Sequence, residues 1–362
     1  PFEATIVGDY LVGRGVQDDK GPSLAALYAV KSLLDDGIQF TKRIRFIFGT
    51  DEETLWRCMN RYNQIEEQAD FGFAPDSSFP LTYAEKGLLQ VKLHGPGWED
   101  LPLQAGQALN VVPDKATYAG HRLEELLPVL DQSGVQCSQT EDSVTVLGVS
   151  KHSKDAAEGV NAIVGLAESL SLIQPHPALL FIADAEDATG EALFGRITDE
   201  PSGDLSFNLA TLVIDQEQSE IGIDIRIPVL ADKNALVARL QEIAASYQLE
   251  YEEFDYLAPL YVPLDSPLVS SLMAVYQEET GDMTPAMSSG GATFARTMGN
   301  CVAFGALFPG AEQTEHQANE RAKIDDLYAG IGGGDIKLHQ LSHYLQTKLI
   351  KPTAEQADEA VL

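Results

Sequence analysis

Two adjacent glutamates, Glu52 and Glu53, follow a short apolar run, and this pair constrains the fold more than any other feature of the chain. The run Ile44-Arg45-Phe46-Ile47-Phe48 predicts a buried strand, and the residues near 53–68 predict a helix. Two carboxylates where the chain turns are awkward in a core and useful in a site. Because adjacent side chains diverge, one carboxylate can bind a metal while its neighbour handles a proton.

Two more acid-rich turns flank this pair, Gln17-Asp18-Asp19-Lys20 upstream and Ala74-Pro75-Asp76-Ser77 downstream. Apolar spacing predicts a helix from Gly21 to Gly37, and a short strand is expected near 71–75. The resulting alternation of strands and helices favours a mostly parallel sheet with flanking helices. Three carboxylate turns at the ends of successive strands then predict a metal site on the rim of an α/β sheet.

The pattern changes after Gly87 and returns near Ser266, which indicates a large α+β insertion in an α/β domain. We expect a first catalytic part over 1–87, an inserted domain over 88–262 and a second catalytic part over 263–362. The elements expected in the insertion are a strand over 88–93, a helix near 114–127, a strand over 144–149, a helix over 159–169, apolar runs over 209–214 and 221–227, and a helix near 232–246. After it come a helix near 266–279, a glycine turn over 288–292, a strand over 301–308, and a helical region interrupted at 330–334.

The charge balance excludes several partners. With 24 basic and 55 acidic residues the net charge is −31, which argues against nucleic acid and anionic membrane surfaces. No apolar stretch is long enough to span a bilayer. The three cysteines show no CxxC spacing, so neither a thiolate zinc site nor a disulfide framework is indicated, and a reducing cytoplasm is expected.

Four residues are candidate metal ligands: Asp18, Glu53, Asp76 and His316. Each follows a predicted strand, and carboxylates and imidazoles suit hard or borderline divalent ions. Singly each has an ordinary alternative, since Asp18 can cap the helix that follows, Asp76 can be a turn residue and His316 can be a surface histidine. Together, in this order, they favour a metal site.

At these residues the chain resembles a known family. The blocks are Gly13-Arg14-Gly15-Val16-Gln17-Asp18-Asp19-Lys20-Gly21-Pro22, then Gly49-Thr50-Asp51-Glu52-Glu53, then Ala74-Pro75-Asp76. They resemble the signature of the dinuclear zinc metallopeptidases that include aminoacylases, carboxypeptidase G, succinyl-diaminopimelate desuccinylase and carnosinases, and most closely the PepV-type bacterial dipeptidases. The resemblance runs through the whole chain in order.

The resemblance implies a role for each candidate. Asp18 would bridge two zinc ions, Glu53 and His316 would complete one ion, and Asp76 would bind the other. Glu52 would be the general base that activates the bridging water. Manganese or cobalt would also suit these ligands.

The insertion carries further matches. His152 resembles the residue that stabilises the oxyanion, and its alternative is a surface histidine. Asn110 resembles a substrate contact. Arg226 resembles the arginine that holds the substrate's C-terminal carboxylate, and its alternative is an internal ion pair with Asp224. Gly290 and Gly291 lie in a glycine-rich loop whose N–H groups would bind the same carboxylate, the alternative being a plain helix N-terminus.

One departure from the family has consequences for activity. The family places a His-x-Asp motif before the segment that corresponds to Pro1, and this sequence has no histidine before His94. We therefore expect an N-terminally truncated chain with a damaged second metal site and little activity, while the full-length protein is a peptidase.

The function expected from the sequence is a cytoplasmic zinc dipeptidase that acts on small peptides. The size of the insertion, like that of the PepV type, predicts a monomer in which the lid covers its own site. Two alternatives stay open: a deacylase of N-acyl amino acids with the same metals and base, and a metal-free binding protein that kept the fold.

Overall fold

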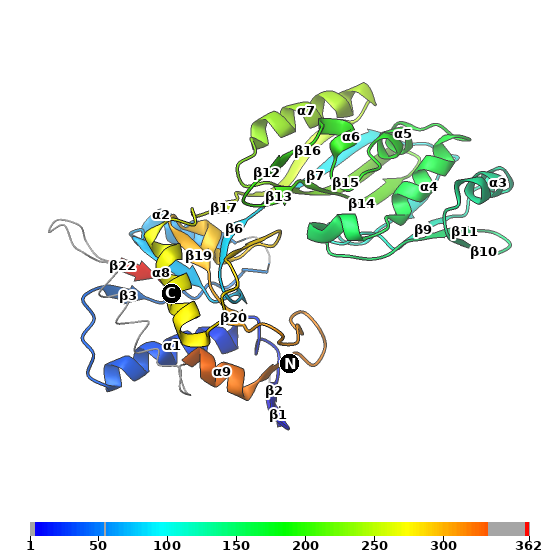
Figure 1. Cartoon of the computed structure of the whole chain (residues 1–362). Coiled ribbons are helices and arrows are strands. Elements are labelled where there is room, and N and C mark those ends of the chain that lie inside the picture. The colour runs from blue at the N-terminus through cyan, green and yellow to red at the C-terminus, as the bar shows by residue number, and fades with distance from the viewer. Residues whose placement is uncertain (1–3, 54–55, 332–358, 362) are drawn as a thin grey trace. The chain divides into compact units, whose positions relative to one another are not determined.

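The computed structural model describes residues 4–53, 56–331 and 359–361. The chain divides into two compact units (Figure 1). Residues 1–85 and 260–362 form what we call the terminal unit, and residues 86–259 form the inserted unit. Within the described residues, no helix has the length and apolar character needed to cross a membrane.

The terminal unit is built on a mixed sheet in the order β17-β6-β19-β4-β22-β3, with β18 also paired to β6. The pairs β19–β4, β4–β22, β22–β3 and β18–β6 are parallel, whereas β17–β6 and β19–β6 are antiparallel. This agrees with the mostly parallel sheet expected from the sequence. Its strands are β3 (Arg43–Arg45), β4 (Phe71–Ala74), β6 (Thr82–Glu85), β17 (Leu260–Tyr261), β18 (Met287–Ser289), β19 (Cys301–Ala303) and β22 (Glu359–Val361).

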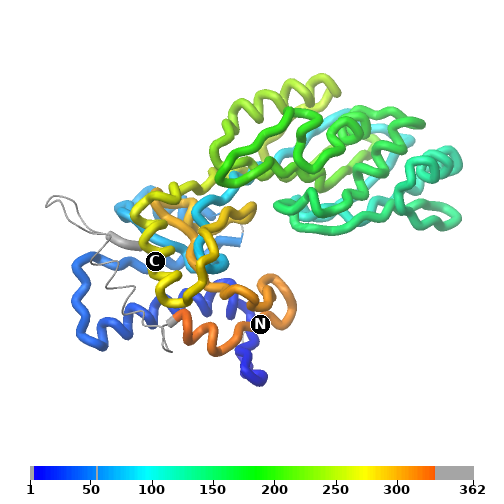
Figure 2. The backbone as a smooth tube through the Cα atoms, in the orientation of Figure 1, coloured from blue at the N-terminus to red at the C-terminus, as the bar shows by residue number. Residues whose placement is uncertain are grey.

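Helices and two small sheets complete the described part of this unit. The helices are α1 (Lys20–Asp35), α2 (Arg57–Ile65), α8 (Pro267–Thr280), α9 (Ile324–Ile331) and the 3₁₀ turn η2 (Phe294–Thr297). The small sheets are β1 (Thr5–Val7), β2 (Tyr10–Val12) and β21 (Arg321–Lys323), and β5 (Ser77–Ser78) with β20 (Ala306–Leu307). Figure 2 shows the early part of the chain beside the segment that leads to residue 331, where β2 pairs with β21 and α1 packs on α9.

The inserted unit holds a five-stranded antiparallel sheet in the order β16-β7-β15-β14-β8. Its strands are β7 (Gly87–Pro96), β8 (Leu103–Ala105), β14 (Ser206–Ile214), β15 (Gln218–Ile227) and β16 (Glu250–Leu257). The other strands are β9 (Lys115–Tyr118), β10 (Cys137–Gln139), β11 (Val144–Leu147), β12 (Thr198–Asp199) and β13 (Gly203–Asp204). The helices are α3 (Leu123–Ser133), η1 (Ser153–Glu158), α4 (Ala162–Ser171), α5 (Pro177–Asp184), α6 (Glu191–Phe194) and α7 (Lys233–Ser246).

One face of this sheet forms a continuous hydrophobic core with the helices. Alternate residues of β7 and β15, such as Val91 and its register partner Ile223, are fully buried. They pack with apolar side chains of α4 and α5, including Leu166 and Phe181. The period-two pattern of the sequence therefore places one face of each strand in the core.

Three expected elements are wrong in detail. Residues 114–127 do not form one helix, because 115–118 pair with β11 as strand β9 and the helix begins only at Leu123. The buried strand over 44–48 is limited to Arg43–Arg45, which pairs with β22 at the end of the sheet order, and Phe48 is 63% exposed. The strand over 301–308 is split at Gly305, whose φ is +70°.

Candidate metal centre and active site

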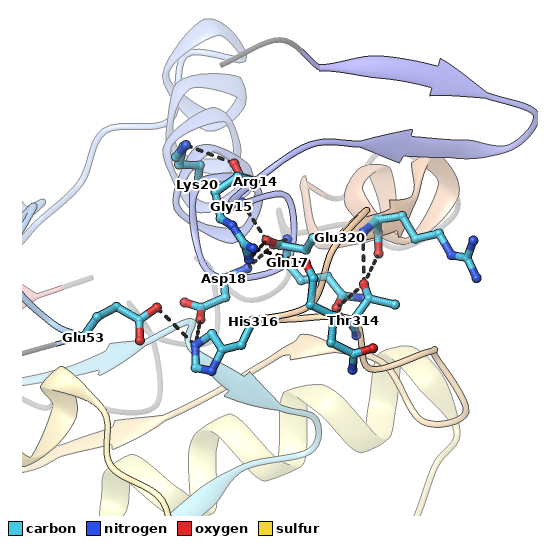
Figure 3. Close-up of polar contacts among 11 residues, drawn as sticks. Arg14, Gly15, Gln17, Asp18, Lys20, Glu53, Thr314, His316 and Glu320 are labelled. Carbon is cyan, nitrogen blue, oxygen red and sulfur yellow. Dashed lines mark hydrogen bonds and ion pairs between the residues drawn. The ribbon is translucent and has the colours of Figure 1, made fainter. Parts of the chain in front are cut away.

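Three side chains from distant parts of the sequence converge in the terminal unit: Asp18, Glu53 and His316. His316 Nε2 lies 2.8 Å from Asp18 Oδ2 and 3.1 Å from Glu53 Oε1 (Figure 3). One ligand atom from each lies within 4.8 Å of the other two. Two carboxylates and one imidazole at this spacing are a suitable ligand set for a divalent ion.

The charges of the cluster act on its histidine. Desolvation alone would lower the pKa of His316, but Glu53 and Asp18 outweigh it, and the pKa is raised. His316 also has a left-handed backbone with φ +59°, which is uncommon for a side chain of this size. The loop therefore presents this imidazole to the two carboxylates in a costly conformation.

Glu320 holds the Asp18 turn against the His316 loop. Its Oε2 accepts hydrogen bonds from Gly15 N at 2.9 Å and Arg14 Nη1 at 2.8 Å, and its Oε1 accepts from Gln17 N at 2.8 Å and Asp18 N at 3.1 Å. Burial would raise the pKa of Glu320, but these donors outweigh burial and lower it. Sequence reasoning gave Glu320 no role; the signal available was a glutamate four residues after His316.

Glu52 and Asp76 line a cavity of about 150 Å³, together with Asp18, Asp19 and apolar side chains. Burial first, and then the neighbouring carboxylates, raise the pKa of Glu52 to about 8 and that of Asp76 to about 9. Glu52 Oε1 is buried without a hydrogen-bond partner. Crowded carboxylates with an orphaned oxygen fit a centre that receives cations.

The cavity does not bring all four expected ligands into one set. Asp76 shares the cavity with Asp18, yet among the described residues it is outside the cluster of Asp18, Glu53 and His316. Asp19, beside the cluster, accepts a hydrogen bond from Ser23 and has a pKa raised mainly by burial.

In the inserted unit, the expected residues Asn110 and His152 lie on neighbouring chain segments. Ser153 N donates to Asn110 O at 2.9 Å, and Val111 bridges to His152. His152 Nδ1 accepts from Lys154 N at 3.1 Å, so the neutral ring carries its proton on Nε2. Burial of the group first, and then Arg226, lower the pKa of His152.

Arg226 forms the internal ion pair with Asp224 that is the alternative to a substrate contact. Its Nε lies 2.7 Å from Asp224 Oδ1 and its Nη2 lies 3.1 Å from Asp224 Oδ2. Nη2 also donates to Ser153 Oγ at 3.0 Å, beside His152. Both charged side chains are buried, so the pair is part of a scaffold beneath the His152 turn.

The glycine-rich loop in the terminal unit is tied to its own side chains. Gly291 N donates to Ser289 Oγ at 2.9 Å, and Gly291 O accepts from Arg296 Nη2 at 2.8 Å. The next turn, η2, begins after Thr293, whose hydroxyl accepts from Ala295 N. The expected residues Gly290 and Gly291 thus lie beside a short capped turn.

These observations define a hydrolase-like α/β unit with a carboxylate and histidine centre and a separate inserted unit. Residues 1–332 match the peptidase family M20/M25/M40. The chain belongs to this family, and it is a peptide-bond hydrolase of that class.

Similar proteins agree with this assignment. A Bacillus subtilis protein named "Putative dipeptidase YtjP" is 36% identical over 352 residues, which cover 90% of this chain and 75% of that protein. A Staphylococcus aureus protein named "Putative dipeptidase MW1694" is 35% identical over 347 residues, which cover 88% and 74%.

Solved structures support the fold. A tripeptidase from Staphylococcus aureus aligns with a TM-score of 0.55 at 14% identity, covering 96% of this chain and 76% of that one. An aminoacylhistidine dipeptidase from Vibrio alginolyticus aligns with a TM-score of 0.55 at 13% identity, covering 94% and 79%.

Proposed function

We propose that this protein is a metal-dependent dipeptidase that hydrolyses short peptides with a free C-terminus. The observation that carries the proposal is the convergence of Asp18, Glu53 and His316 next to Glu52, whose Oε1 is buried. The dipeptidase names of its relatives support the choice of substrate class.

Two zinc ions are the proposed cofactors, with manganese or cobalt as alternatives. Asp18, Glu53 and His316 would hold one ion, and Asp76 would hold the other, with Asp18 shared between them. When bound, the ions would lower the pKa of a shared water and polarise the scissile carbonyl.

Glu52 is the proposed general base. It would take the proton of the attacking water and deliver it to the leaving amine. Its Oε1 has no hydrogen-bond partner that would compete for this proton, and its surroundings raise its proton affinity.

The remaining contacts would come from His152, Asn110 and Arg226 of the inserted unit and from Gly290 and Gly291 of the terminal unit. His152, neutral and protonated on Nε2, would donate to the oxyanion of the tetrahedral intermediate. Asn110 would contact the substrate. Arg226 is a proposed anchor for the substrate carboxylate, which would share the guanidinium with Asp224; the N–H groups of Gly290 and Gly291 are the second proposed anchor. We propose that one chain supplies all of these groups as a monomer, which sedimentation tests.

The compartment proposed is the cytoplasm. Cys58, Cys137 and Cys301 are all free thiols, which suits a reducing environment.

The test separates the base from the ligands. In the natural protein, Glu52→Gln should lower kcat for dipeptides by about 10²–10⁴-fold while metal content stays unchanged. The exposed Glu66→Gln is the matched control and should leave both unchanged. A metal-loaded protein that hydrolyses no dipeptide would overturn the proposed function.

A further inference from the structure

A buried ion pair joins two parts of the terminal unit that the function needs. Arg296 Nε lies 3.1 Å from Glu85 Oε2, and the two side chains are 2% and 1% exposed. Thr293 also donates two hydrogen bonds to Glu85. Its N lies 3.1 Å from Oε2 and its Oγ1 lies 2.7 Å from Oε1. Burying a charge pair costs desolvation and contributes little net stability, so its value lies in what it orders.

On one side the pair fixes the glycine-rich loop. The same guanidinium donates through Nη2 to Gly291 O at 2.8 Å. Because an arginine fork is planar and rigid, holding Glu85 also fixes the direction of the hydrogen bond to Gly291.

On the other side it meets the segment that carries Glu52. The guanidinium carbon of Arg296 lies 5.9 Å from the ring centroid of Trp56, a distance suited to a cation–π contact. Trp56 is 4% exposed, and its indole N–H donates to the main-chain oxygen of Glu52. Trp56 also has a left-handed backbone with φ +53°, a conformation that persists only where the surroundings impose it.

Packing reinforces the same link. The Phe294 ring meets Trp56 edge-on, with centroids 5.5 Å apart and planes at 75°. A Cβ added to Gly49 would lie 2.2 Å from Phe294 Cε2, so only glycine admits this ring. Asn63 Nδ2 donates to Thr297 O at 2.7 Å. The turn η2 therefore contacts Gly49, Trp56 and Asn63.

We propose that Arg296, fixed by Glu85, is a positioning residue that holds the Glu52 segment and the Gly291 loop in one register. It acts through Trp56 on one side and through Gly291 O on the other. The assignment of these two segments to proton transfer and substrate binding rests on the proposed function, whereas the mechanical link between them does not.

The experiment uses Trp56 as its own reporter. The chain has two tryptophans, so Trp98→Phe leaves Trp56 as the only one. In that background Arg296→Lys keeps the charge but loses the fork, and Trp56 emission should shift to the red with stronger acrylamide quenching. For dipeptides, kcat should fall about 10- to 100-fold and KM should rise with it. Metal affinity should stay unchanged.

Two variants give the comparison. Ser289→Ala loosens only the Gly291 turn and should raise KM without lowering kcat. Arg43→Lys, in the exposed pair with Glu67, is the control and should change neither fluorescence nor kinetics.

Unchanged Trp56 emission and quenching in a folded Arg296→Lys variant would overturn the proposal. If the natural protein hydrolyses no dipeptide, the proposed function fails. The fluorescence of Trp56 still tests the positioning role of Arg296. If Arg296→Lys does not fold, Trp56→Phe keeps an aromatic ring at this position but loses the N–H bond to the main-chain oxygen of Glu52. It should lower kcat at unchanged metal affinity, and an unchanged kcat would overturn the proposal.

Discussion

Four carboxylates of the terminal unit, Asp18, Asp19, Glu52 and Asp76, line one cavity, whereas the buried carboxylate of Asp224 in the inserted unit is paired with a cation. Burial and neighbouring carboxylates raise the pKa values of Glu52 and Asp76, while Asp224 is paired to Arg226 and also accepts from Gln90 Nε2 at 3.0 Å. Unbalanced charge of one sign prepares a centre for an ion that arrives later. Balanced charge makes a rigid support, here beneath the turn that bears His152.

The largest effect is expected from unbalancing the inserted unit. Asp224→Asn leaves the buried Arg226 without its counter-charge and should lower the free energy of unfolding by about 3–5 kcal/mol. Asp204→Asn breaks the exposed pair with Arg196 and should cost less than about 1 kcal/mol. Urea unfolding measures both. Equal costs for the two variants would show that the buried pair of Asp224 and Arg226 supports the inserted unit no more than an exposed pair does.

Next in size is the loss of a proposed ligand from the terminal unit. His316→Asn should weaken zinc binding by more than about a hundredfold, since changes beyond the ligands alone cost roughly 10–100-fold. Isothermal titration against zinc measures this, with exposed His121→Asn as the control. If the two histidine variants bind zinc equally, His316 is no ligand.

A smaller loss should follow from Glu320→Gln. The amide keeps one acceptor oxygen but loses the charge that attracts Arg14 and the N–H groups of the Asp18 turn. Zinc affinity should fall by about 10–100-fold with the ligands themselves intact. Glu312→Gln, in the exposed pair with Arg321, is the control; a similar loss in that variant would show that the effect is only one of net charge.

A further comparison uses the opposite signs of the pH dependence that Glu52 and Asp76 in the terminal unit and His176 in the inserted unit contribute to stability. In the metal-free terminal unit, Glu52 and Asp76 have pKa values raised to about 8 and about 9, so their stabilising contribution is complete below about pH 4 and is lost as the pH rises toward 9. In the inserted unit, burial lowers the pKa of His176. The contribution of this residue to stability is therefore present above pH 6.5 and is lost as the pH falls.

Each unit has one tryptophan, Trp56 or Trp98, so single-tryptophan variants can follow the two unfolding transitions separately by fluorescence. Trp98 lies beside His176, with ring centroids 5.7 Å apart. Added zinc should reduce the loss of stability at high pH in the terminal unit and leave the inserted unit unchanged. Transitions that shift in the same direction with pH would contradict the assignment of opposite signs.

Local signals explain which elements the sequence predicted well. The helices near 232–246 and 266–279 were predictable because Asp232 and Ser266 are side-chain caps at their first turns. The prediction of one helix over 114–127 was wrong because residues 115–118 form strand β9 by pairing with β11. The spacing of apolar residues along the chain does not reveal such a pairing.

The candidate site divides in the same way. Asp18, Glu53 and His316 were predicted because acidic turns and the histidine recur in the order of a known family. Glu85, Arg296 and Glu320 were missed because their partners are long-range: Glu85 and Arg296 are 211 positions apart, and Glu320 and Asp18 are 302 apart. Which of many acids is buried and paired is decided by the tertiary fold.

The division of the chain also sets an order for its synthesis. The inserted unit is contiguous from 86 to 259, while the terminal unit is made of segments on both sides of it. On the ribosome, the inserted unit can fold as soon as its last strand and helix have emerged, whereas the Asp18 turn must wait for residues beyond 300. The proposed metal ligands can therefore come together only after His316 has been synthesised, when the whole of the inserted unit that bears His152 has already been made.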